Sequence, residues 1–162
     1  MTGSVGTAMQ SRPSWDEVWS HVAEAVSARS LCVRAQVGAV IVDTRHRIIA
    51  TGHNGPPSGF DHEGLPCTFW CERGETGAVD QLYDNCVSLH AEANALMMAD
   101  RSTWQGGTIY VLGDVCFGCA KLIANSGLSN VVVRRDGQSR DYRLPERSYE
   151  FLERCGLTVV VE

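Results

Sequence analysis

Apolar residues near the start of the chain recur at intervals of three and four. Between Trp15 and Val26 this spacing is typical of an amphipathic helix that turns one apolar stripe toward a core. Ser14 followed by Glu17 has the pattern of a capping box and places the start of the helix. Residues 1–12 are small and polar without periodicity, so we expect a flexible N-terminal tail there.

A different pattern begins at Val37, where the residues up to Val42 are continuously apolar and rich in β-branched side chains. Such a run is typical of a strand buried on both faces. A polar turn follows, and Ile48 to Thr51 is predicted to return as the second strand of a hairpin. Further on, we expect helices at 89–99, 120–125 and 144–154 and strands at 108–112, 131–134 and 157–161. Because strands and helices alternate, the sequence predicts an α/β fold with a largely parallel sheet covered on both faces.

The segment from Gly52 to about Val79 has no such periodicity and is rich in glycine and proline. Irregular segments of this length inside a compact domain usually carry a function or are held in place by another group. Cys67 and Cys71 lie within it.

The length of 162 residues suits one domain, which we place at 13–162. The charge is −5, from 14 Lys+Arg and 19 Asp+Glu, and an acidic chain is a poor binder of nucleic-acid backbone. We find neither an apolar run long enough to span a membrane nor a secretory signal, and therefore expect a cytoplasmic protein. In that reducing setting, an odd count of seven cysteines favours metal binding over disulfides.

Two short motifs carry candidate chemistry. His90-Ala91-Glu92 lies at the start of a predicted helix, and Cys116-Phe117-Gly118-Cys119 lies where a predicted strand gives way to a helix. One histidine and two cysteines are three zinc ligands, which leave the fourth tetrahedral position for a water with a lowered pKa. Glu92 is too close in sequence to His90 to share the metal comfortably, but its carboxylate can move protons to and from that water.

The arrangement corresponds to the H-x-E…P-C-x-x-C pattern of zinc nucleobase deaminases, with 23 residues between Glu92 and Cys116. Two other interpretations stay open. A further cysteine could close the zinc site and make it purely structural, or Cys116 and Cys119 could form a redox pair. The redox pair would leave His90 and Glu92 without a role.

Residues 28 to 134 resemble the cytidine deaminase superfamily, and most closely its deoxycytidylate (dCMP) deaminase branch. The similar segments, in family order, are 28–32, 36–42, 51–59, 90–95 and 116–123. The resemblance implies a three-layer α-β-α sandwich with a central mixed five-stranded sheet. It also implies a catalytic zinc and the hydrolytic conversion of dCMP to dUMP and ammonia.

The same resemblance assigns further roles. His90, Cys116 and Cys119 correspond to the zinc ligands and Glu92 to the proton shuttle. The substrate-binding positions would be Asn54 toward the nucleoside, the backbone N–H of Ala91 toward the pyrimidine carbonyl, and Arg101 near the phosphate. Asn54 could instead be a turn residue of an Asn-Gly pair, and Arg101 an exposed residue after a helix.

Some dCMP deaminases that resemble this chain carry a second, structural zinc. The candidate ligands here are Cys32, Cys67, Cys71 and Cys86, and His62 could replace one of them. The alternative is that Cys32 and Cys86 are small buried hydrophobic residues.

The sequence departs from the family pattern in three places. Val115 replaces the proline before the first cysteine, which we expect to loosen that loop. His53 replaces a tyrosine, and residues 134–137 lack the aromatic side chains that often close over the base. Another substrate (cytosine, guanine, a triazine or a cytidine-like compound) therefore stays open, as do a tRNA-editing deaminase and an inactive zinc-stabilised scaffold. The resemblance also implies a homo-oligomer, from dimer to hexamer.

Overall fold

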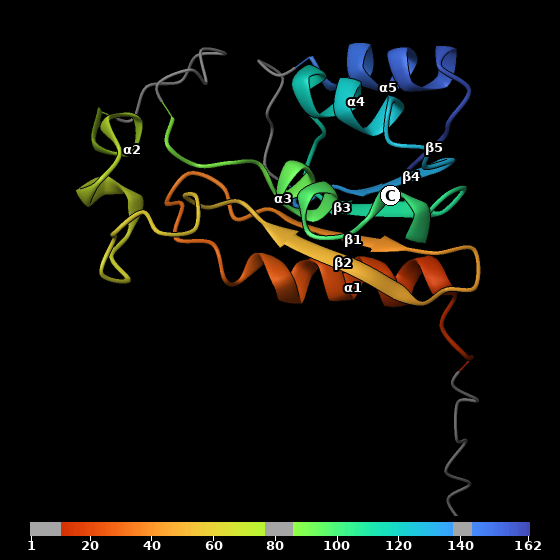
Figure 1. Ribbon diagram of the computed structural model, residues 1–162, viewed down its shortest axis with the longest axis horizontal. Helices are drawn as coiled ribbons and strands as arrows, with labels where there is room; N and C mark the ends of the chain where they lie inside the picture. Colours follow the sequence, from red (N-terminus) through yellow and green to blue (C-terminus); the bar gives the residue numbers. More distant parts are fainter. Residues whose placement is uncertain (1–10, 77–85, 138–143) are drawn as a thin grey trace, which may run out of the picture.

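The computed structural model describes residues 11–76, 86–137 and 144–162 (Figure 1). Its strands form one five-stranded sheet in the order β2-β1-β3-β4-β5. The strands are β1 (Gly38–Val42), β2 (Ile48–His53), β3 (Thr108–Leu112), β4 (Asn130–Arg134) and β5 (Thr158–Val161). The helices are α1 (Trp15–Ser27), α2 (Glu72–Thr76), α3 (Ala91–Met97), α4 (Phe117–Ala124) and α5 (Pro145–Arg154), with short 3-10 turns η1 (Cys67–Phe69) and η2 (Arg101–Thr103).

The sheet is mixed, as the family resemblance implied. β1 is antiparallel to both of its neighbours, β2 and β3, whereas β3, β4 and β5 are parallel to one another. The connection through α3 carries the chain from β2 past β1, so β3 takes the direction of β2. The expectation of a largely parallel sheet from the alternation of elements was therefore wrong for the β2-β1-β3 half.

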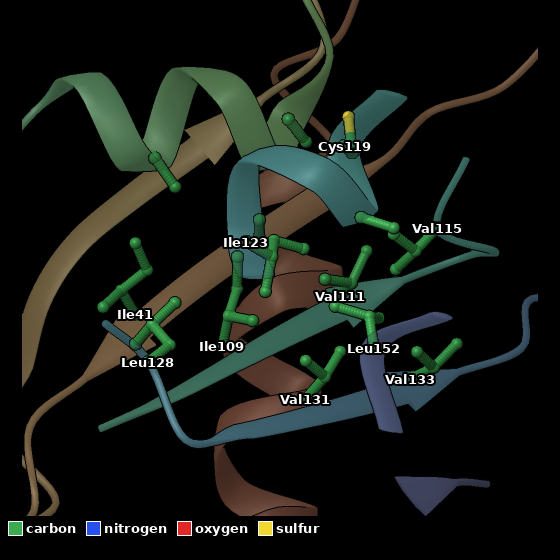
Figure 2. Close-up of a cluster of buried hydrophobic side chains, with 14 of the residues drawn as sticks. Ile41, Ile109, Val111, Val115, Cys119, Ile123, Leu128, Val131, Val133 and Leu152 are labelled. Carbon is green, nitrogen blue, oxygen red and sulfur yellow. The ribbon is translucent and has the colours of Figure 1, made fainter. Parts of the chain in front are cut away.

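Helices cover the sheet on both faces and make the predicted three-layer sandwich (Figure 1). α1 packs on β1 and β3 from one side, where Val40 and Tyr110 are buried. α3, α4 and α5 lie on the other side, over a larger core that includes Ile41, Ile109 and Leu152 (Figure 2). Neighbouring residues of β1 thus enter different cores, because side chains alternate across a strand.

Local sequence patterns predicted the bounds of most helices and strands to within a few residues of those in the structure. The capping box of α1 is formed: the Ser14 hydroxyl accepts from the Glu17 N–H at 3.1 Å, and the Glu17 carboxylate accepts from the Ser14 N–H at 2.7 Å. β1 is buried along its whole length, as predicted. Of the predicted tail, residues 1–10 lie outside the described part of the chain.

Three elements differ from the sequence prediction. α3 starts at Ala91 and not at 89, α4 starts at Phe117 and not at 120, and the segment after β2 contains η1 and α2. As a result, His90 and Cys116 are the N-cap residues of α3 and α4. No helix within the described residues has the length and hydrophobicity to cross a membrane.

Candidate active site

The two predicted motifs meet at the N-terminal ends of α3 and α4. The Nδ1 atom of His90 lies 3.3 Å from the Sγ atom of Cys116 and 3.3 Å from that of Cys119. All three ligand atoms lie within 4.8 Å of one another. A tetrahedral zinc with ordinary bond lengths separates a sulfur and a nitrogen ligand by about 3.5 Å. The donor set therefore fits zinc in both chemistry and spacing.

The N-cap residues of α3 and α4, His90 and Cys116, direct their side chains toward the site. Cys116 has an extended backbone (φ −75°, ψ 160°), and its sulfur accepts from the Cys119 N–H at 3.4 Å. His90 has nearly the same backbone conformation at the start of α3. The positive ends of two helix dipoles thus lie near two cysteine sulfurs, which favours their thiolate forms.

The pKa values of the two cysteines are shifted in opposite directions. A hydrogen bond from the Cys119 thiol, assisted by the nearby His90 ring, lowers the pKa of Cys116 to about 3. The pKa of Cys119 is raised because its thiol donates that bond and is buried beside Glu92. Both sulfurs become thiolates together when a cation offsets the second negative charge, which a zinc ion does.

Glu92 completes the group. It is in the first turn of α3, only 2% exposed, and its carboxylate lies close enough to raise the pKa of the Cys119 thiol. The carboxylate is thus held beside the ligand set rather than in solvent. A purely structural zinc site would not need an acidic side chain in this position.

Comparison with known proteins agrees with this geometry. Residues 13–135 match the model of the cytidine and deoxycytidylate deaminase zinc-binding region. The chain belongs to this family. It is a zinc-dependent deaminase, with His90, Cys116 and Cys119 as its zinc-binding group.

Individual relatives support the same placement. The deoxycytidylate deaminase of Mycobacterium phage D29 is 42% identical over 132 residues, which cover 78% of this chain and 98% of that protein. The yeast (Saccharomyces cerevisiae) deoxycytidylate deaminase is 38% identical over 149 residues, which are 91% of this chain but 45% of that longer protein. The crystal structure of the dCMP deaminase of cyanophage S-TIM5 in complex with dCMP and dUMP superposes with a TM-score of 0.68 at 27% identity, covering 94% of this chain and 100% of that one.

The deaminase anchors its α3 helix to the neighbouring strand segment. Asn94 of α3 donates its side-chain amide to the carbonyl oxygen of His53, at 2.8 Å. Leu89 and Gly55 exchange backbone hydrogen bonds at 2.8 and 3.1 Å just before the helix begins. These contacts fix the position of His90 and are not visible in either motif.

Asn54 is buried, and both ends of its amide contact the backbone. Its oxygen accepts from the Val37 N–H at 2.8 Å, and its nitrogen donates to the Ala35 carbonyl at 2.9 Å. Asn54 therefore ties the end of β2 to the segment before β1. Ala91 is fully buried between His90 and Glu92 at the start of α3. Their predicted contacts with a nucleotide stay predictions.

Arg101 lies in η2, after the C-terminal end of α3, and is exposed. α3 advances about 10 Å along its seven residues. The helix thus places Arg101 at the opposite end from His90. Within one subunit, Arg101 therefore does not lie beside the zinc-binding group. Its contact with the phosphate stays a prediction.

A cavity of about 240 Å³ that the motifs did not point to adjoins the Asn54 segment. Arg29, His53 and His62 contribute to its wall. Burial, together with the positive charge of Arg29, lowers the pKa of His53. The only feature of the sequence that drew attention to this region was the departure from the family pattern at His53.

Three of the four cysteines of the predicted second site lie on adjoining backbone segments. The Cys67 sulfur accepts from the Val33 N–H at 3.4 Å, next to Cys32, and the Cys71 N–H donates to the Cys67 carbonyl oxygen at 2.9 Å. Burial raises the pKa of Cys67 and of Cys86, and the nearby Cys32 and Cys71 raise it further. His62 is instead on the cavity wall, where its Nδ1 accepts from the Gly64 N–H at 3.0 Å.

Proposed function

We propose that the protein removes the exocyclic amine of dCMP by hydrolysis, giving dUMP and ammonia. The observation that carries the proposal is the buried Glu92 carboxylate beside a zinc-binding group of three ligands. Support for the substrate comes from relatives named deoxycytidylate deaminase at up to 42% identity.

The residues of the chain divide the work between proton transfer and binding. When bound, zinc activates a water molecule for attack. Glu92 would take a proton from a water molecule as the water oxygen bonds to C4 of the base, and would deliver that proton to N3. It would then take the remaining proton from the new C4 hydroxyl and pass it to the amine as the C4–N bond breaks and ammonia leaves. The N–H of Ala91 at the start of α3 is suited to hold the pyrimidine carbonyl, because the first N–H groups of a helix have no partner within it.

The substrate assignment is tested by comparing ammonia release from dCMP, deoxycytidine, cytosine and guanine. We expect dCMP to be preferred in kcat/KM. A preference for an unphosphorylated compound would remove the nucleotide from the proposal and favour the alternative suggested by His53 and residues 134–137. Turnover of a tRNA substrate alone would assign the protein to RNA editing, and zinc binding without any deamination would make it a scaffold.

A second, structural zinc is proposed at Cys32, Cys67, Cys71 and Cys86. Cys67 lies beside the segment that carries Cys32, and the Cys71 N–H donates to the Cys67 carbonyl oxygen at 2.9 Å. Burial raises the pKa of Cys67 and Cys86, so a cation would be needed to convert these thiols to thiolates at neutral pH. A metal here would hold η1 and α2 in place. Thiols that bind a metal are kept reduced in the cytoplasm, which supports that location for the protein.

Metal analysis tests the second site. We expect two zinc ions per chain, falling to one in Cys67→Ser and staying at two in Cys155→Ser, which changes an exposed cysteine. A single zinc in the unmodified protein would refute the second site and leave the first one standing.

We also propose that the protein is a homo-oligomer. Met97 and Met98 at the end of α3 are 61% and 69% exposed, and Leu122 of the adjacent α4 is 51% exposed. Large apolar side chains on packed helices are typical of a surface that another subunit covers. Sedimentation should give a mass above 17.7 kDa, reduced by Met98→Glu but not by Val33→Glu. A monomeric unmodified protein would contradict the proposal.

A further inference from the structure

The zinc ligand Cys116 lies at the end of a segment that departs from the family pattern. Val115 precedes it in place of a proline, whose ring would fix the backbone φ angle there. Loosening of this loop was the expectation. Instead, Val115 is completely buried among the side chains beneath α4 (Figure 2), and the residue before it is held by side-chain contacts.

Asp114 provides those contacts. It is 6% exposed, and its Oδ1 atom accepts from the Tyr149 hydroxyl at 2.9 Å and from Nε of Arg135 at 3.2 Å. Arg135 also donates to the Glu146 carboxylate at 3.1 Å. Tyr149 and Glu146 belong to α5, and Arg135 follows β4, so the segment is tied to two distant parts of the chain.

α5 also holds the residue on the other side of Cys116. The Phe117 ring lies 5.1 Å from the Phe151 ring, and the Arg147 guanidinium lies over it at 4.6 Å from the ring centre. Cys116 therefore lies between two residues, Asp114 and Phe117, that are each fixed by side chains of α5.

We propose that α5 positions Cys116 for zinc, chiefly through the Tyr149–Asp114 hydrogen bond and the Arg135–Asp114 ion pair. Asp114 and Tyr149 are positioning residues and touch no substrate. A buried carboxylate with two donors has few allowed orientations, so it restricts the backbone on its own side of Cys116. The contacts thereby replace the conformational restriction of a proline. The proposal rests on the zinc site of the proposed function but not on the identity of the substrate.

Tyr149→Phe tests this directly, because it removes one hydroxyl and leaves the ring in place. Tyr110→Phe is a matched control: its hydroxyl donates to the Asp16 carboxylate at 2.7 Å in the α1 layer, on the other face of the sheet. We expect both variants to lose similar thermal stability. Only Tyr149→Phe should weaken zinc binding, measured by competition with a chelator. The expected loss is about 3- to 10-fold, since removing groups bonded directly to a metal ligand typically costs about 10- to 100-fold.

Two further measurements separate positioning from general stability. In the cobalt-substituted protein, the thiolate-to-metal absorption should shift in Tyr149→Phe and not in Tyr110→Phe. Arg135→Gln changes a half-exposed side chain and should also weaken zinc binding. It provides the test if Tyr149→Phe does not fold.

Equal zinc affinity and equal cobalt spectra in the two tyrosine variants would overturn the proposal, as would an Arg135→Gln variant with unchanged zinc affinity. If the protein binds zinc but does not deaminate dCMP, the proposed substrate fails while the positioning role of α5 is still tested by the same zinc measurements.

Discussion

Gly52 of β2 lies directly against Ala91, the first residue of α3. A Cβ atom on Gly52 would collide with the Ala91 carbonyl oxygen and would lie 2.5 Å from the backbone nitrogen of Ala95. α3 can approach the sheet this closely only because residue 52 has no side chain. The height of α3 above the sheet in turn sets the positions of His90 and Glu92.

Gly52→Ala should therefore displace the start of α3. We expect it to lower zinc affinity and deaminase activity and to destabilise the fold by about 1–3 kcal/mol, as overpacking usually does. Gly38→Ala is the control, because a Cβ there would collide with the Ala23 carbonyl oxygen of α1, on the other face of β1. It should destabilise the fold without weakening zinc binding in the folded protein. Equal zinc affinities in the two variants would contradict the positioning role of Gly52.

The charge of Arg29 should be detectable at His53. Burial is the larger cause of the lowered pKa of His53, and Arg29 is the second. Arg29→Gln should raise the pKa of His53 while leaving it below its ordinary value, because the ring stays buried. An NMR titration of the imidazole measures this directly. Arg45→Gln, in the turn at the other end of β2, should leave the titration unchanged; no shift in Arg29→Gln would refute the coupling.

Asp43 should make the β1–β2 turn sensitive to acid. Its carboxylate accepts the backbone N–H groups of Arg45 and Arg47 at 2.9 Å and pairs with the Arg47 side chain, which lowers its pKa to about 2. A lowered pKa stabilises the folded state above pH 3.8, and this contribution is lost as pH falls toward 2. In urea unfolding between pH 4 and pH 2, Asp43→Asn should show a smaller loss of stability than the unmodified protein. Parallel pH profiles would show that the turn makes no such contribution.

The sequence predicted the zinc-binding group of His90, Cys116 and Cys119 correctly, because short motifs report local chemistry. The role of Glu92 as proton shuttle stays a prediction. The sequence misplaced the starts of α3 and α4 because His90 and Cys116, which cap them, are not among the usual N-cap residues. Sequence alone also could not show that β1 is antiparallel to both neighbours.

What the sequence failed to predict was mainly the contacts between residues that are far apart in the chain. Tyr149 and Asp114 are 35 positions apart, and Asn94 and His53 are 41 apart. Only the folded chain brings such pairs together. The structure places Arg101 in η2, at the far end of α3 from His90, because the direction of that helix sets its position. The contact with the phosphate that the family resemblance implies stays a prediction.

The central claim is that Glu92 moves protons at a site whose zinc is held by other residues. Its most direct test is ammonia release from dCMP by Glu92→Gln at matched zinc content, with Glu150→Gln, an exposed change on α5, as the control. The account predicts full zinc content in both variants. It also predicts a kcat lowered about 10²- to 10⁴-fold in Glu92→Gln alone. Turnover by Glu92→Gln at the unmodified rate would contradict the account.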